Sequence, residues 1–380
     1  MDNNNLSAVL TRQRPARIVH AQNYWQWFQH HQNHGTLPRE IADCCSQLDL
    51  IQHLGLDVFS RNIYSDQQRG WWGGLAEMVW TPDVECEVRE SYDGHDRIIE
   101  RIYRTRAGEL TERLRYVFAG STLVQEKFLV EDYETQLDAL EVLLRARRWR
   151  FVPERYRAWQ DRVGAGGCVV AGELHSPLKM LHVTLDPQNT TLLLEDYPDR
   201  AGQLLALHEA AMLDLVEQMA RAGVRAMMSM DNLDSAFHSP QYVERYSASF
   251  YRRAAELCHR HESLLFIHAC GHQRYILKLI ASLGVDGLEG VAFPPLGDVG
   301  LDEAMRLAGD SLIITGGISA LEYDNLVTRE EIFEYVRNLL TLMRPYAHRF
   351  ILSASCATPY TAAWEKIVHF RDAWREYGDC

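Results

Sequence analysis

Short apolar runs alternate with amphipathic segments along the chain after residue 165. Short runs that lack polar alternation are typical of strands buried on both faces of a parallel sheet. The segments between them carry apolar residues three or four positions apart, which is the spacing of an amphipathic helix. The apolar runs lie at residues 168–171, 225–230, 264–267, 285–292, 312–317 and 350–353. This alternation predicts a series of βα units.

Several helix boundaries are marked by residues that commonly begin or end helices. The helix predicted at 202–222 is followed by Gly223, a common C-terminal stop. Thr328 and Glu331 form a capping box, which predicts that a helix begins there. Further helices are predicted at 240–261, at 276–283, at 302–307 and at the end of the chain.

Two architectures contain strands and helices in this order: an open doubly wound sheet and a closed barrel. A doubly wound sheet that binds a dinucleotide has a glycine-rich fingerprint after an early strand. The sequence has no such fingerprint at that place. We therefore expect an α/β fold in which residues 1–380 form a single (β/α)₈ TIM barrel.

The region before residue 165 has a different character. It is irregular and rich in aromatic residues, and its strand-like segments 98–103 and 114–118 flank Ala107-Gly108-Glu109. Two such segments around a glycine-containing turn predict a β-hairpin. We expect residues 1–50 to form an irregular N-terminal extension and residues 80–120 to leave the barrel as an inserted hairpin.

Composition and charge exclude several classes of function. The chain has 52 acidic and 39 basic residues, a formal net charge of -13 and no long basic cluster, so we expect no nucleic-acid partner. No apolar run approaches the roughly 18 residues needed to span a bilayer. The polar start of the chain is unlike a signal peptide, and we expect a cytoplasmic protein. In that reducing compartment, disulfides are not expected among the eight cysteines, and metal binding gains weight.

Polar side chains follow most of the predicted strands. In a parallel barrel the carboxyl ends of the strands form one rim, where functional residues lie. The residues at this rim are Glu173, His175, Asp231, Asn232, His268, Cys270, His272, Glu289, Gly316, Gly317, Ser355 and Cys356. Helix capping or salt bridging is an alternative role for His272, Asp231 and Glu289.

His268 and Cys270 are the most informative pair at this rim. Residues two positions apart in extended geometry project from the same face, which puts an imidazole beside a thiol. Cys356 follows the last predicted strand and reaches the same rim. One His and two Cys with an open fourth position is the pattern of a catalytic zinc site, and soft thiolates disfavour Mg²⁺ and Ca²⁺. A buried histidine with nearby core cysteines is the alternative.

The sequence from about residue 223 onward resembles the uroporphyrinogen decarboxylase superfamily. The segments that carry the resemblance are 229–233, 266–272, 284–288 and 315–318. An earlier segment, 103–112, resembles members linked to corrinoid-dependent methyl transfer. The resemblance covers about two thirds of the chain and implies a (β/α)₈ barrel.

This superfamily has two chemistries, and the resemblance implies the second. Its metal-free decarboxylases hold substrate propionates with arginines after the first strand, but the corresponding residues 20–27 contain no arginine. Its zinc methyltransferases use a His-x-Cys pair and a distant Cys, which His268, Cys270 and Cys356 match. The resemblance therefore implies bound Zn²⁺ and methyl transfer between a small methylated compound and the corrinoid (cobalamin) of a partner protein.

Roles for the other rim residues follow from this implied chemistry. Glu173 or Asp231 would act as a catalytic residue that fills the open zinc position or moves protons there. The aromatic residues of the N-terminal region favour an aryl methyl ether over a thiol as substrate, and that region would help to dock the corrinoid protein. The expected substrate-binding residues are Asn232, His272, Glu289, Gly316 and Gly317.

Three other functions are compatible with the same residues. The first is a metal-free decarboxylase of the uroporphyrinogen type. The second is a non-enzymatic barrel that holds a corrinoid or a partner protein. The third is a zinc thiol methyltransferase that uses a folate donor and needs no corrinoid. Metal content, turnover and the methyl donor distinguish them.

Overall fold

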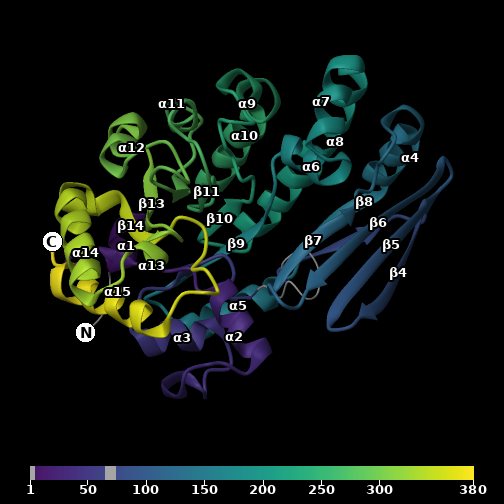
Figure 1. Ribbon diagram of the computed structural model, residues 1–380. Coiled ribbons are helices and arrows are strands. Elements are labelled where there is room, and N and C mark those ends of the chain that lie inside the picture. The colour runs from purple at the N-terminus through teal and green to yellow at the C-terminus, as the bar shows by residue number, and fades with distance from the viewer. Residues whose placement is uncertain (1–4, 65–73) are drawn as a thin grey trace.

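The computed structural model describes residues 5–64 and 74–380. Its central sheet has eight strands in the order β1-β14-β13-β12-β11-β10-β9-β2, and all neighbours pair in parallel (Figure 1). The edge strands meet at Asp57, whose N–H donates to the His20 carbonyl and whose carboxylate accepts from the His20 N–H, both at 3.0 Å. The sheet therefore curls into the (β/α)₈ barrel that the alternating pattern predicts. Its strands are β1 (Val19–His20), β2 (Phe59–Ser60), β9 (Cys168–Leu174), β10 (Ala226–Ser229), β11 (Leu264–His268), β12 (Gly287–Val291), β13 (Ile313–Ile318) and β14 (Phe350–Ala354).

Helices cover the outside of the barrel (Figure 1). The capping box at Thr328 is present, but the helix predicted at 240–261 is divided at Ser247, whose φ of −129° departs from helical geometry. No helix in the described part of the chain is both long and apolar enough to cross a membrane. The helices are α1 (Asn5–Leu10), α2 (Trp25–His34), α3 (Gln47–Leu54), α4 (Tyr133–Ala146), α5 (Pro153–Val163), α6 (Pro177–Leu185), α7 (Pro187–Asp196), α8 (Pro198–Arg221), α9 (Pro240–Tyr246), α10 (Ala248–His259), α11 (Leu277–Ala281), α12 (Leu301–Ala308), α13 (Glu322–Asn325), α14 (Arg329–Met343) and α15 (Trp364–Tyr377).

The amino end of the barrel is closed by α1. Leu6 of this helix packs in one apolar cluster with inward-facing strand residues such as Phe266. Arg12, just after α1, donates to the carbonyls of Asp286 at 3.1 Å and Ser311 at 2.5 Å, which precede β12 and β13. The carboxyl end is therefore the end that is left for functional loops.

A second sheet is inserted between β2 and β9. It is antiparallel, with the order β4-β5-β6-β7, and α4 packs against it through Leu137, Leu140 and Leu144. Figure 1 shows it extending from one side of the barrel. The predicted hairpin is present as β5 and β6, but the pattern did not predict their neighbours, because most residues of β4 are polar and exposed. The inserted strands are β3 (Ala76–Trp80), β4 (Val84–Asp93), β5 (Asp96–Thr105), β6 (Gly108–Val117), β7 (Thr122–Lys127) and β8 (Arg147–Phe151), with β3 and β8 paired antiparallel.

Residues 5–50 form part of the barrel rather than an irregular extension beside it. They supply β1, and both Trp27 of α2 and Leu50 of α3 are buried in the main core. A strand of two residues, such as β1 or β2, shows no recognisable alternation in a sequence. The sequence therefore predicted six barrel strands of the eight and missed the first two.

Candidate metal centre

His268, Cys270 and Cys356 converge at the carboxyl end of the barrel. His268 is the last residue of β11, and Cys356 lies just after β14. The three donor atoms all lie within 4.8 Å of one another. In the sheet order β11 and β14 are separated by two strands, so the curvature of the barrel brings these residues together. The residues predicted as metal ligands thus form one cluster.

The backbone around the two cysteines is held in place from both sides. Gly271 has a φ of 120°, and a Cβ atom there would overlap the Asp234 carboxylate, so glycine is required for the turn after Cys270. Asn23, in the loop after β1, donates from Nδ2 to the Cys356 carbonyl at 2.7 Å. The metal ligands are therefore presented by constrained loops.

A buried ion pair orients His268. Strand register places His268 of β11 directly beside Glu289 of β12, and the imidazole Nδ1 hydrogen bonds to Glu289 Oε2. Arg61 donates from Nε to both Glu289 oxygens, at 3.2 and 3.1 Å, and to Asn62 from Nη1 at 3.1 Å. With Nδ1 engaged by the carboxylate, Nε2 of His268 is the nitrogen left for a metal, an arrangement that fixes the ring and raises its basicity.

The electrostatics of this group keep the carboxylate ionised. Burial raises the pKa of Glu289, but Arg61 and His268 outweigh it and lower that pKa to about 2. The two thiols interact with each other: a hydrogen bond from Cys270 lowers the pKa of Cys356 well below its ordinary value and raises the pKa of Cys270. A thiolate on Cys356 is thus favoured even before a metal displaces the second thiol proton.

The donor set fits a zinc ion. One imidazole and two sulfurs are the soft and borderline ligands that zinc prefers over magnesium or calcium. Three protein ligands leave a fourth tetrahedral position for a small molecule, as in catalytic sites. Cys356 is exposed to the cavity described next, so that position is reachable.

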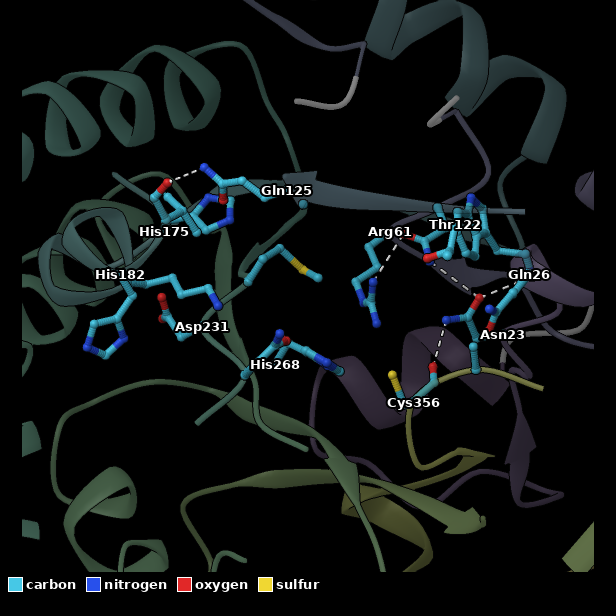
Figure 2. A pocket seen from close by; sticks show the side chains of 18 of the residues that line it. Asn23, Gln26, Arg61, Thr122, Gln125, His175, His182, Asp231, His268 and Cys356 are labelled. Atoms are coloured by element: carbon cyan, nitrogen blue, oxygen red, sulfur yellow. Dashed lines mark hydrogen bonds between the residues drawn. The ribbon is translucent and has the colours of Figure 1, made fainter. Parts of the chain in front are cut away.

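A cavity of about 650 Å³ opens beside the donors, a size suited to a small-molecule ligand. The barrel loops supply one part of its lining, including Arg61 and Asp231, and the inserted sheet supplies another, including Gln125 of β7. Figure 2 shows His182 and Asp231 on one side of the cavity and Arg61 and Cys356 on the other. The cavity therefore has a metal-binding end and a second polar end.

Asp231 and Asn232, predicted at the end of β10, both line this cavity. Asp231 is buried, and its oxygens accept from the Ser176 N–H at 2.7 Å and from the Tyr251 hydroxyl at 2.6 Å. Asn232 has a φ of 49°, in the left-handed region that Asn tolerates better than most residues. Hydrogen bonds therefore fix the carboxylate of Asp231, and Asn232 lies where the chain turns at the cavity.

Comparison with known proteins agrees with this fold. The uroporphyrinogen decarboxylase (URO-D) family matches residues 100–377, well over half of the chain. The chain belongs to the uroporphyrinogen decarboxylase family. A methyltransferase from Methanosarcina mazei has a similar structure, with a TM-score of 0.60 and 13% identity over 99% of this chain and 98% of its own. A D-psicose 3-epimerase from Clostridium cellulolyticum H10 matches less well, with a TM-score of 0.37 and 10% identity over 60% of this chain and 86% of its own. Among curated proteins, none matches the sequence.

The loop after β1 presents none of the arginines that the sequence resemblance leads us to expect of a decarboxylase. That loop lines the cavity with Asn23, Trp25 and Gln26 rather than with arginine. Arg61 does enter the lining from the segment after β2, but its charge is balanced by the Glu289 carboxylate. A substrate with many carboxylates would therefore find little positive charge at this end.

Glu173, a predicted catalytic residue, is not among the described residues that line the cavity. It is buried, and its carboxylate accepts a hydrogen bond from the Leu75 N–H at 3.1 Å, at the start of the inserted region. Burial raises the pKa of Glu173 to about 7. Its position on β9 links the barrel to the insertion rather than to the metal ligands.

The other predicted substrate-binding residues also lie away from the cavity lining. His272 is partly exposed and pairs with Asp234 at 3.3 Å. Gly316 and Gly317 are buried in β13, and a Cβ on Gly316 would come within 2.5 Å of the Val291 carbonyl oxygen. These glycines allow close packing of neighbouring strands, and Glu289 serves His268, as described above.

Sequence reasoning missed several residues of the cavity. Arg61 follows the two-residue strand β2, which no pattern revealed, and Gln125 belongs to an unpredicted strand of the insertion. Lys179 and His182 lie on α6, directly after β9, and both line the cavity. The sequence did offer one signal for these two residues: they lie three positions apart, and so on one side of the helix, directly after a strand that the pattern predicted.

Proposed function

We propose that this protein transfers a methyl group between a small molecule and the corrinoid of a partner protein, with Zn²⁺ bound by His268, Cys270 and Cys356. The observation that carries the proposal is the convergence of these three donors beside a cavity of ligand size. Membership of the uroporphyrinogen decarboxylase family and the fold shared with a methanogen methyltransferase support it.

The metal supplies Lewis-acid stabilisation of negative charge on the heteroatom that carries or receives the methyl group. The protein's own residues do the positioning. Glu289 and Arg61 hold the His268 ring, and Asn23 holds the loop of Cys356. Such fixed geometry lowers the barrier because little reorganisation is left for the reaction itself.

Asp231 is the acid we propose for the substrate side of the site. It lines the cavity, and its two hydrogen bonds fix its orientation. With Asn232 it would position the part of the small molecule that lies away from the metal ligands. Glu173 has no such access in the described structure, and we assign it a structural role instead.

An aryl methyl ether is the substrate type we favour, with a thiol as the alternative. The cavity is lined by Trp25, Tyr64, Phe128 and Phe237, which offer apolar faces to a planar ring. A volume of about 650 Å³ exceeds what a short thiol alone would occupy. In both cases the heteroatom would lie beside the metal ligands.

A corrinoid protein would approach over the carboxyl end of the barrel. Phe237 and Tyr275 are 76% and 70% exposed in the loops after β10 and β11, on that same rim. Large exposed aromatic side chains are common in protein interfaces. They offer a docking surface next to the cavity.

Methyl transfer to or from free cobalamin tests the proposal. Zinc-loaded protein is incubated with methylcobalamin and a thiol, or with Co(I) cobalamin and an aryl methyl ether, and the cobalamin absorbance is followed. We expect turnover by the wild type and by Cys45→Ser, whose cysteine is exposed and belongs to no metal cluster of the described residues, but not by Cys356→Ser.

Rival functions give different results in the same assays. Carbon dioxide release from a porphyrinogen by metal-free protein would indicate a decarboxylase. Methylation of a thiol from a methylated folate without cobalamin would indicate the folate-dependent enzyme. Tight cobalamin binding without turnover, unaffected by Cys356→Ser, would indicate a binding protein.

A further inference from the structure

Lys179 brings a positive charge to the cavity from α6, beside Asp231 and within electrostatic reach of Cys270. It lies in the first turn of α6, where its N–H donates to the Ser176 hydroxyl at 3.3 Å. Lys179 and His182 are three residues apart, on the same side of the helix, and both line the cavity. Figure 2 shows His182 across the cavity from Cys356.

No carboxylate in the described part of the chain forms an ion pair with Lys179. Asp231 is the acid with the largest electrostatic influence on it. The two Asp231 oxygens already accept from the Ser176 N–H and the Tyr251 hydroxyl. A largely buried ammonium without a close partner costs free energy, which an anionic ligand would recover.

Two imidazoles lie beside this ammonium without adding charge. His182 and His238 both line the cavity, and their rings are 5.3 Å apart. Burial lowers the pKa of His182 to about 3 and lowers that of His238 as well. Near neutral pH both rings are uncharged, and each carries one N–H donor. The Nδ1 of His238 already lies 3.2 Å from the Asp234 carbonyl oxygen, so the His182 ring is the one that adds hydrogen-bonding capacity for an oxyanion beside this single positive charge.

Arg61, the cation at the metal-binding end, is not available to bind an anionic ligand in this way. Arg61 also lines the cavity, but its Nε donates to both oxygens of Glu289 and its Nη1 to Asn62. Its charge is thus neutralised within the protein. Of the lysines and arginines that line the described cavity, Lys179 is the one that lacks a carboxylate partner.

We propose that the small methylated or methyl-accepting compound is an organic anion, whose oxyanion group binds Lys179 between His182 and His238. This rests on the proposed function and names the substrate class for the same site. The heteroatom of the compound would lie beside His268 and Cys356. An aryl ether or a thiol that also carries an acid group meets this requirement, and a neutral analogue does not.

Calorimetric titration of the zinc-loaded protein with two probe thiols tests this assignment. The probes are 3-mercaptopropionate, which carries a carboxylate, and 3-mercaptopropanamide, its neutral analogue of nearly the same shape. A charge-assisted hydrogen bond at Lys179 predicts that the wild type binds the acid about ten- to a hundred-fold more tightly than the amide. Lys179→Met removes this preference and leaves the affinity for the amide unchanged. Lys278→Met, an equal change of charge at an exposed position, keeps the preference.

The outcomes separate this proposal from the one on which it rests. Equal binding of both probes by the wild type overturns the anionic-substrate assignment and leaves the metal site intact. Binding of neither probe by protein that contains zinc overturns both. The wild-type comparison needs no variant, so poor folding of Lys179→Met does not remove the test. If Lys179→Met weakens both probes equally, the lysine has a structural role and the assignment fails.

Discussion

The two ends of the cavity treat charge in opposite ways. At the metal-binding end, Arg61 and Glu289 neutralise each other and hold His268, so the residues are arranged before any ligand arrives. At the other end, Lys179 lacks a carboxylate partner among the described residues, and the imidazoles beside it are uncharged. A site that always holds the same metal ion benefits from side chains whose positions are fixed and whose charges are neutralised within the protein. A site for an anionic substrate instead needs a positive charge that no protein group neutralises.

The largest expected effect comes from removing one member of the buried Arg61–Glu289 ion pair at the metal-binding end. Arg61→Met leaves Glu289 buried without its cationic partner, since both side chains are only 9% exposed. Removing one member of a buried pair costs about 3–5 kcal/mol. Urea denaturation of metal-free protein measures this loss. The control is Arg252→Met, whose pair with Glu244 is 44% and 48% exposed, with an expected cost below about 1 kcal/mol. Equal losses in the two variants would contradict a special role for the buried pair.

A pH-dependent effect is expected where the barrel meets the insertion. The pKa of Glu173 is raised by burial from 4.5 to about 7, so the unfolded chain loses this proton at lower pH than the folded chain. Its contribution to stability is therefore fully present below pH 4.5 and falls as the pH rises towards 7, by about 3 kcal/mol at most.

Glu173→Gln removes that titration, so stability relative to wild type should increase from pH 4.5 to pH 7.5. Denaturation curves at several pH values measure the difference. A pH-independent difference would contradict the burial argument. Zinc content and methyl transfer should survive in this variant, because Glu173 does not line the cavity in the described structure.

An intermediate effect is expected on metal affinity. Glu289→Gln keeps the size of the side chain but weakens the hydrogen bond that orients His268. Loss of such a supporting carboxylate lowers metal affinity by about 10- to 100-fold. Competition with a zinc chelator measures it. The matched change Glu112→Gln, of an acid that lines the cavity from the inserted sheet, should leave zinc affinity unchanged. Unchanged affinity in Glu289→Gln would mean that the carboxylate does not support the metal site.

The smallest expected effect concerns the inserted sheet. Gln125 of β7 donates to the Val183 carbonyl of α6 at 3.0 Å and so connects the insertion to the helix that carries Lys179. Gln125→Ala should cost about 0.5–1.5 kcal/mol of stability. It should weaken binding of the anionic probe thiol slightly and leave zinc content unchanged. Loss of zinc in this variant would show that the two ends are not independent.

The sequence was most informative where strands are long enough to show a pattern. The run before His268 and the run before Cys356 identified two strand ends, and the barrel then required those ends to share a rim. The role of Glu289 was not predictable, because it depends on the register that places this residue beside His268. Its position at the rim was recognised, with substrate contact as the expected role and salt bridging, which the pair with Arg61 shows, as the alternative.

The opposite wall of the cavity depends on features that a sequence pattern does not reveal. Arg61 follows a strand of two residues, and Gln125 reaches the cavity from an inserted sheet whose strands are largely polar. Lys179 is one charged residue on a short helix, indistinguishable in sequence from a solvated surface lysine. Only tertiary packing shows that it borders a cavity and lacks an acidic partner.

The central claim is tested most directly by the metal content of the purified protein. Wild type, Cys270→Ser, Cys356→Ser and the control Cys45→Ser are prepared under reducing conditions, loaded with zinc and dialysed, with folding checked by circular dichroism. The account predicts about one zinc ion per chain in the wild type and the control, and none in the two folded site variants. Absence of zinc from the wild type, or full zinc in folded Cys356→Ser, would contradict it.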